Sequence, residues 1–240
     1  MRVDIFIRTY SKDLPWLAYA LKSIHKYVTG WDRIIVAIPE GEGHLLNHLC
    51  AEQVVAVPDL QDGYLGQQLT KMQAWKYTYA DAILFWDSDV VATQPIDIRK
   101  EYFNTNCESP ARIKLYKTRY SSMPGNPWQP IVAKALGFLP SWEYMRRMPL
   151  VYWRESLTDC EEYIVKTHGQ SLEHYIRSQP FRSFSEFNVI GAFAAGHHPD
   201  RYEFIDTESV DMPPNKVDQM WSWGGITPEV MEKMRAYGLA

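Results

Sequence analysis

The chain of 240 residues is short of cysteine and of long apolar runs, and both shortages narrow the class of protein. Its 3 cysteines, Cys50, Cys107 and Cys160, are widely spaced and form no Cys-x-x-Cys pair. This argues against a disulfide framework or a zinc site and fits a reducing compartment. No apolar stretch approaches the ~20 residues that cross a bilayer, and the first residues lack a signal-peptide pattern. We therefore expect a cytoplasmic protein without stable membrane insertion.

Two common nucleotide-binding motifs are also missing. No GxGxxG follows the first predicted strand, which argues against a dinucleotide-binding Rossmann protein, and GxxxxGK[ST] does not occur. A formal net charge of −4 gives no general attraction to nucleic acid or to an anionic membrane. Because no repeat or linker divides the chain, a single domain over 1–240 is expected.

What is present is an alternation of short apolar runs and helical patterns. The runs predict strands at 3–7, 33–38, 53–57 and 82–86, and helices are predicted at 12–28, 42–50 and 64–79. This order predicts an α/β fold with a Rossmann-like, mainly parallel sheet flanked by helices. The less regular second half predicts a strand at 112–118 and helices at 129–137, 155–167, 170–178, 185–193 and 228–237. In such sheets ligands bind at the carboxyl ends of the strands.

An acidic pair, Asp87 and Asp89, directly follows the apolar strand 82–86. Two neighbouring carboxylates repel each other, and a divalent cation relieves that repulsion. Oxygen ligands favour Mn²⁺ or Mg²⁺ over zinc. The plain structural alternative is a strand-end turn in which Asp87 caps a loop. A DxD phosphatase is weaker, because Val91 stands where its motif has threonine and three strands come first.

In four segments the sequence resembles the GT-A nucleotide-sugar glycosyltransferases, including small bacterial and phage members of that class. The segments, in their expected order, are Arg8-Thr9-Tyr10-Ser11 after the first strand, the helix Leu65–Lys71, the motif FWDSDVV, and Ser185-Glu186-Phe187-Asn188. The resemblance covers most of 1–100 and, loosely, 183–226. It implies a GT-A-type single domain, with 1–100 as the nucleotide-sugar-binding half and 101–240 as the acceptor-binding half and C-terminal lid.

The resemblance also implies roles for individual residues. Asp87 and Asp89 would hold Mn²⁺ or Mg²⁺, which acts as a Lewis acid on the leaving diphosphate. Glu186 would be the general base, or would position donor-sugar hydroxyls, and Asn188 would bind sugar or acceptor. The plain alternative for Glu186 is a favourable acid at a helix N-terminus. The donor, most plausibly a UDP-sugar, would contact Arg8, Thr9, Tyr10, Asp62, Lys71, Asp87 and Ser88.

The C-terminal segment departs from the family pattern. Many GT-A enzymes supply a further metal ligand there, often histidine, whereas this chain has Asp218-Gln219-Met220-Trp221-Ser222-Trp223-Gly224-Gly225. Asp218, Ser222, a water or the earlier pair His197-His198 are the alternatives for that ligand. Gly224 and Gly225 would let backbone N–H groups approach the diphosphate, and Trp223 would close over the donor or belong to the core.

The acceptor is the least defined part of the prediction. A glycan or small molecule is the default, and DNA with hydroxymethylated bases is an alternative, since basic and aromatic residues alternate between 112 and 154. Functions of other classes remain open: a nucleotidyltransferase, which would need a Gly-rich basic loop after the first strand, the DxD phosphatase, and a catalytically silent sugar-binding module.

Overall fold

The computed structural model describes residues 1–49, 52–60, 62–105 and 111–240, and its centre is a five-stranded sheet. The strand order is β11–β5–β1–β3–β4, formed by Leu150–Trp153, Ala82–Asp87, Val3–Arg8, Arg33–Pro39 and Gln53–Val57. The four strands from the first half run parallel, as the sequence predicts. β11 pairs antiparallel with β5 and was not expected. The predicted class, α/β with a mainly parallel sheet, is confirmed.

Burial explains why these strands read as continuous apolar runs. β1 is buried along its whole length, and β5 is buried from Ala82 to Trp86. In the parallel register of these two strands, Arg8 lies opposite Asp87. A strand covered on both faces tolerates few polar side chains, so the polar residues collect where β1 and β5 end together.

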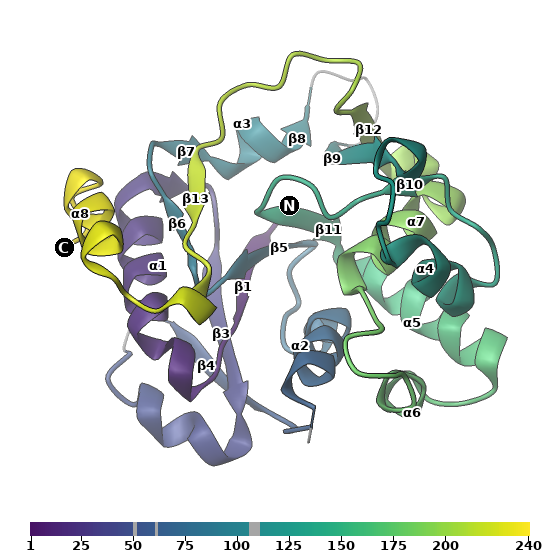
Figure 1. The fold of residues 1–240 in the computed structure, drawn as a ribbon, viewed down its shortest axis with the longest axis horizontal. Helices are drawn as coiled ribbons and strands as arrows, with labels where there is room; N and C mark the ends of the chain where they lie inside the picture. Colours follow the sequence, from purple (N-terminus) through teal and green to yellow (C-terminus); the bar gives the residue numbers. More distant parts are fainter. Residues whose placement is uncertain (50–51, 61, 106–110) are drawn as a thin grey trace.

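Helices cover both faces of the sheet (Figure 1). α1 (Leu14–Tyr27) lies on one side with α8 (Pro228–Ala236) outside it, and a helical group occupies the other side. That group consists of α4 (Trp128–Leu136), α5 (Arg154–His168), α6 (Leu172–Arg177) and α7 (Glu186–His197), with α2 (Gly63–Met72) packed against α6 and α7. α4 to α8 match the predicted helices within a few residues.

Three predicted helices differ in detail. The first begins with a 3-10 turn, η1 (Ser11–Asp13), so that α1 starts later than expected. The helix expected at 42–50 is the 3-10 segment η2 (Glu40–Leu46), and Cys50 lies outside the described residues, as does Cys107. The helix expected to reach residue 79 ends at Met72, followed by η3 (Ala74–Lys76).

The strands outside the central sheet form smaller sheets. β9 (Arg112–Arg119) pairs with β8 (Phe103–Asn104), β10 (Trp142–Glu143) and β12 (Tyr202–Asp206), the last in parallel. β2 (Val28–Thr29) pairs with β7 (Ile96–Asp97), which leads into α3 (Ile98–Tyr102). The remaining 3-10 turns are η4 (Tyr120–Ser122) and η5 (Pro199–Arg201).

The C-terminal segment returns to the acidic motif. β13 (Val217–Gln219) pairs antiparallel with β6 (Val90–Ala92), the strand that directly follows Asp89. The turn η6 (Ser222–Gly224) follows, and α8 then packs on α1 through a small cluster that includes Trp16, Met220 and Met234. Residues more than 120 positions apart in sequence therefore meet beside the carboxyl end of β5.

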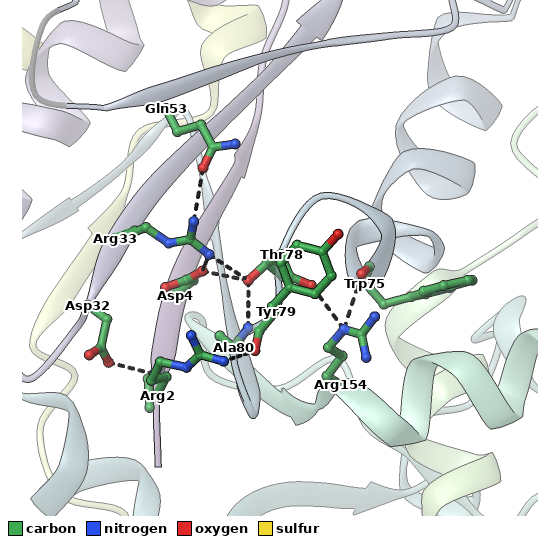
Figure 2. Close-up of polar contacts among 11 residues, drawn as sticks. Arg2, Asp4, Asp32, Arg33, Gln53, Trp75, Thr78, Tyr79, Ala80 and Arg154 are labelled. Carbon is green, nitrogen blue, oxygen red and sulfur yellow. Dashed lines mark hydrogen bonds and ion pairs between the residues drawn. The ribbon is translucent and has the colours of Figure 1, made fainter.

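At the amino ends of the strands, a polar network surrounds the buried Asp4 (Figure 2). Asp4, at the start of β1, is buried and accepts hydrogen bonds from Arg33, at 2.7 Å, and from Thr78, at 2.5 Å. Arg154 of α5 donates to the backbone carbonyls of Trp75 and Thr78 at 3.2 and 2.9 Å. These contacts tie β1, β3, the segment before β5 and α5 together at the amino ends of the strands.

In the described part of the chain, no helix is long and apolar enough to cross a membrane. Cys160 is a free, buried thiol in α5. Its pKa is raised by burial, so it serves as a small apolar side chain of the core.

Candidate functional site

The candidate site lies where β1 and β5 end. Arg8 ends β1, Asp87 ends β5, and the two occupy paired positions in the sheet. Thr9 and Tyr10 continue from Arg8, and Ser88 and Asp89 continue from Asp87. The sheet thus brings together the two polar segments that the sequence predicts at this edge.

Lys71 connects α2 to the acidic motif. Its Nζ lies 2.8 Å from Oδ1 of Asp87 and 3.2 Å from Oε1 of Glu186. The side chain of Lys71 is only 7% exposed and that of Glu186 3%, so both charges are held inside the protein. Burial alone would lower the pKa of Lys71, but the two carboxylates outweigh it and raise that pKa. Lys71 is therefore a charged, paired group and not a solvated helix lysine.

Glu186 begins α7 and lies behind Lys71. Burial raises the pKa of Glu186, against the opposing effect of Lys71, and the backbone N–H of Glu186 donates to Oε1 of Gln68 at 3.0 Å. Glu186 does stand in the first turn of α7, as the plain alternative of an acid at a helix N-terminus expects, and it is in addition buried against Lys71. A general base must reach the proton of the acceptor, and in this structure Glu186 instead holds Lys71 beside Asp87.

Asn188, the other predicted catalytic residue, has no exposed surface. Its Oδ1 accepts from the backbone N–H of Tyr144 at 2.8 Å, and its Nδ2 donates to Ser185 and Glu143 at 3.0 and 3.4 Å. Both amide hydrogens are occupied within the protein. The structure therefore places Asn188 as a residue that fixes α7 against β10.

Asp89 is held by the C-terminal segment. The backbone N–H of Ser222 donates to Oδ2 of Asp89 at 2.9 Å, and the N–H of Met220 donates to the Asp89 carbonyl at 2.8 Å. Burial raises the pKa of Asp89, and the charges of Asp87 and Asp13 add to that rise while the Ser222 hydrogen bond opposes it.

Asp13 is a third carboxylate of the site, which sequence reasoning missed. It is 8% exposed and accepts a hydrogen bond from the buried Ser88 at 3.2 Å. Its pKa is raised by burial and by Asp87. An acid three residues after the polar end of β1 was the available signal. The sequence pattern places it only within the helix predicted at 12–28, whereas in the structure it ends the 3-10 turn η1.

The end of β1 carries unsatisfied polar groups. Arg8 and Thr9 are buried, at 5% and 0% exposure. Within the described residues, Nε of Arg8 and Oγ1 of Thr9 have no hydrogen-bond partner, although Nη1 of Arg8 donates to the Thr9 carbonyl. Tyr10 is partly exposed, and its pKa is raised by burial and by the nearby acids Asp13, Glu42 and Asp89. Unpaired buried polar atoms are costly, so this edge is suited to a polar ligand.

Asp62 is held by hydrogen bonds within the protein, whereas the C-terminal residues 221–225 are open to a ligand. Asp62 caps α2, since its Oδ1 accepts from the backbone N–H groups of Tyr64 and Leu65 at 2.9 and 3.2 Å. Trp223 is 85% exposed and is therefore not a core residue. Gly225 has a φ of 71°, which glycine adopts without strain, and a Cβ at Gly224 or Gly225 would meet nothing within 4 Å. The segment 221–225 thus lies beside Asp89 with an open surface.

Among the protein side chains named as alternatives for a further metal ligand, two are held elsewhere. Asp218 points toward α8, where its Oδ2 accepts from Tyr237 at 3.0 Å and lies 3.3 Å from Lys233. His198 contacts Ser156 and Asp159 of α5, at 2.9 and 3.1 Å. The His197 ring packs against Tyr163 and Phe193. Ser222 lies at the acidic motif, through its N–H to Asp89 and its side chain near Asp13, and the alternative of a water ligand stays a prediction.

In the described ranges, no three His, Cys, Asp or Glu side chains are arranged to hold a metal ion. The donor set nevertheless fits a hard cation bound in part by a substrate. Asp13, Asp87 and Asp89 bring three carboxylates near one another. Lys71 pairs with Asp87 and with Glu186. Mg²⁺ is commonly held by one or two carboxylates plus substrate phosphates and waters.

Comparison with known proteins adds no family assignment. A scan against protein-family models finds no match to the chain, and a search of curated proteins finds none. The functional argument therefore depends on the geometry of the site.

Proposed function

We propose that the protein is a metal-dependent glycosyltransferase of the GT-A type, which transfers a sugar from a nucleoside-diphosphate sugar, most plausibly a UDP-sugar, to an acceptor hydroxyl. The observation that carries the proposal is the meeting of Asp13, Asp87 and Asp89 at the carboxyl end of a parallel sheet, beside the unpaired polar atoms of Arg8 and Thr9. A site without carboxylates could bind a phosphate without a metal ion. This edge is rich in carboxylates, so a diphosphate needs a cation there.

The site residues divide into two groups with separate tasks. Asp87 and Asp89 would hold Mn²⁺ or Mg²⁺, which supplies Lewis-acid stabilisation of the departing diphosphate. Arg8, Thr9 and Tyr10 would receive the nucleoside, with the two unpaired groups binding its polar edge and Tyr10 stacking on the base. Ser88 keeps Asp13 in place by its hydrogen bond.

Lys71 and Glu186 form the second group. Lys71 would contact the donor beside Asp87, because its ammonium group is already fixed 2.8 Å from that carboxylate. Glu186 acts as a positioning residue that keeps Lys71 in place. In this assignment Glu186 acts on the donor through Lys71 and does not deprotonate the acceptor. The assignment follows from the burial of the Glu186 carboxylate. The segment 221–225, with Trp223, Gly224 and Gly225, would close over the bound donor.

Hydrolysis of sugar nucleotides is the direct test. The chain is incubated with UDP-, GDP- and dTDP-sugars in Mn²⁺ or in EDTA, and nucleoside diphosphate release is measured. We expect release from at least one donor in Mn²⁺ and none in EDTA. Calorimetry then gives the affinity for UDP, GDP and dTDP. The absence of metal-dependent affinity for all three would overturn the proposal.

Glu186→Gln separates the two roles of Glu186. If it positions Lys71, donor hydrolysis and transfer fall together, by at least ten-fold. If it were the acceptor base, transfer would fall while donor hydrolysis persisted. Glu232→Gln, on the exposed surface of α8, is the matched control and leaves both rates unchanged.

A further inference from the structure

A cavity of about 540 Å³ lies next to the candidate site, between α2, α6 and the loop that leads to α7. Its volume falls in the ~300–1,000 Å³ range of small-molecule sites. Its lining combines apolar and aromatic side chains, among them Leu60, Tyr64 and Phe181, with two arginines, Arg177 and Arg182, and one carboxylate, Asp62. No residue of β1 or of the acidic motif lines the cavity. Asp62, which the sequence predicts as a donor contact, does line it, but its Oδ1 accepts from the backbone N–H groups of Tyr64 and Leu65 at the start of α2.

The two arginines differ in their partners. Arg177 lies 2.8 Å from Glu173, one turn back on α6. Arg182 forms no ion pair with any part of the chain that the structure describes; its guanidinium lies over the rings of Tyr64 and Phe181, at 5.8 and 5.3 Å from their centroids. Arg182 also has a φ of 57°, a conformation that costs energy for a residue other than glycine. The cavity therefore contains one exposed cation that lies between two aromatic rings and forms no ion pair in the described residues.

The aromatic surface is open as well. Phe181 is 71% exposed although it is a large apolar side chain. An exposed ring beside a planar cation is suited to a ligand with an apolar ring face and a negative group, because the ring face stacks and the guanidinium forms paired hydrogen bonds with a carboxylate or phosphate.

Tyr64 connects the cavity to the buried charges. Its hydroxyl donates to the carbonyl of Phe184 at 3.2 Å, and its pKa is raised by burial and by the charge of Glu186, with Lys71 opposing. The loop that carries Phe181 and Arg182 continues directly into Glu186 at the start of α7. A ligand in the cavity would thus lie one side chain away from Lys71 and Glu186.

We infer that this cavity binds the acceptor, and that the acceptor is an acidic saccharide whose carboxylate or phosphate is bound by Arg182 and whose ring packs on Phe181. The inference rests on the proposed function, since it assigns the second substrate of the same site. It differs from the sequence prediction, which placed acceptor-binding residues among the basic and aromatic residues between 112 and 154.

Ligand-detected NMR of the intact chain tests the inference without needing catalysis. The probes are methyl β-glucuronide, glucose 6-phosphate and the neutral methyl β-glucoside, and the variants are Arg182→Ala and the control Arg235→Ala, an exposed arginine of α8. We expect at least one acidic probe to bind ten-fold or more tightly than the glucoside. The difference should disappear in Arg182→Ala and persist in Arg235→Ala. The glucuronide and phosphate arms show which acid is preferred.

Binding of UDP with Mn²⁺, measured in the same samples, separates this inference from the proposed function. Arg182→Ala should leave that affinity unchanged. Equal binding of acidic and neutral probes, or acidic-probe binding that survives in Arg182→Ala, would overturn the acceptor assignment while UDP binding sustains the enzyme. A ten-fold loss of UDP affinity in Arg182→Ala would also overturn it, because the cavity would then belong to the donor.

Discussion

Among the site residues, Lys71 is the one whose substitution should lower the free energy of unfolding most. Its side chain is 7% exposed, and its single positive charge is shared between the carboxylates of Asp87 and Glu186. Removing one partner of a buried ion pair typically costs about 3–5 kcal/mol, because the remaining charge stays buried and unpaired. Lys71→Met should therefore lower the free energy of unfolding by that order in urea titrations.

A second lysine supplies the control for this prediction. Lys76 pairs with Glu161 but is 40% exposed, so Lys76→Met should cost less than about 1 kcal/mol. The double variant Lys71→Met/Glu186→Gln should recover part of the loss, since it removes one of the unpaired carboxylates. Equal destabilisation by the two single lysine variants would contradict the assignment of Lys71 as a buried charge.

For Asp89, unlike Lys71, we expect a substitution to abolish ligand binding without lowering the stability of the fold. Its pKa is raised by burial and by Asp87 and Asp13, which means that the ionised form is disfavoured in the folded protein. In Asp89→Asn the side-chain oxygen can still accept from Ser222, while one of three repelling charges is lost. We expect an unchanged or higher melting temperature together with loss of Mn²⁺-dependent UDP binding, measured by calorimetry. Asp200→Asn, an exposed acid of η5, should change neither.

The residues of the site were only partly predictable from the sequence. Asp87, Asp89 and Lys71 follow from strand and helix patterns, because the carboxyl ends of parallel strands meet at one edge. The contacts of Asp13 and Ser222 could not be derived in the same way. Each depends on a tertiary contact, Asp13 with Ser88 and Ser222 with Asp89, across 75 and 133 positions of sequence. Local periodicity carries no information about such pairs.

At the scale of elements, α7 is the helix whose packing positions Glu186. A Cβ built at Gly191 would lie 2.4 Å from Cβ of Tyr144, so α7 and the segment after β10 approach as closely as a glycine allows. Tyr144 also donates its backbone N–H to Asn188 on the same helix. The close approach and the hydrogen bond fix the rotation of α7, and with it the direction of Glu186.

Two glycines of α7 give a matched pair of variants. Gly191→Ala should destabilise the protein by about 1–3 kcal/mol or more, through overpacking against Tyr144. Gly196→Ala has nothing within 4 Å of its new methyl group and should be neutral or stabilising by up to about 1 kcal/mol. Thermal or urea unfolding of both variants checks this. A similar loss in both would show that α7 does not pack closely at Gly191.

Four of the strands absent from the sequence prediction are short, or apolar without a strand-specific pattern. β6 and β13 have three residues each and β10 has two, and their pairing partners lie far along the chain. β11 has four apolar residues that fit a strand or a helix equally well, and it becomes a strand because β5 offers a free edge. The four parallel strands were predictable because each is a longer apolar run bounded by polar residues.

For the whole molecule, ligand binding should appear as a gain in stability. A ligand that binds only the folded state stabilises it by about 2.7 kcal/mol at 100 times its dissociation constant. UDP with Mn²⁺ should therefore raise the melting temperature of the chain, while UDP with EDTA should not. Equal stabilisation in both conditions would show that the nucleotide binds without the metal and would contradict the roles of Asp87 and Asp89.

The pairing of β13 with β6 has a consequence for biosynthesis. Domains are built from the N-terminus as the ribosome releases the chain, so β1, β3, β4 and β5 can associate while residues beyond 200 are still being translated. Asp89 obtains its hydrogen bonds from Met220 and Ser222 only after those residues emerge. The scaffold of the sheet can thus form first, and the acidic edge reaches its final arrangement in one of the last steps of folding.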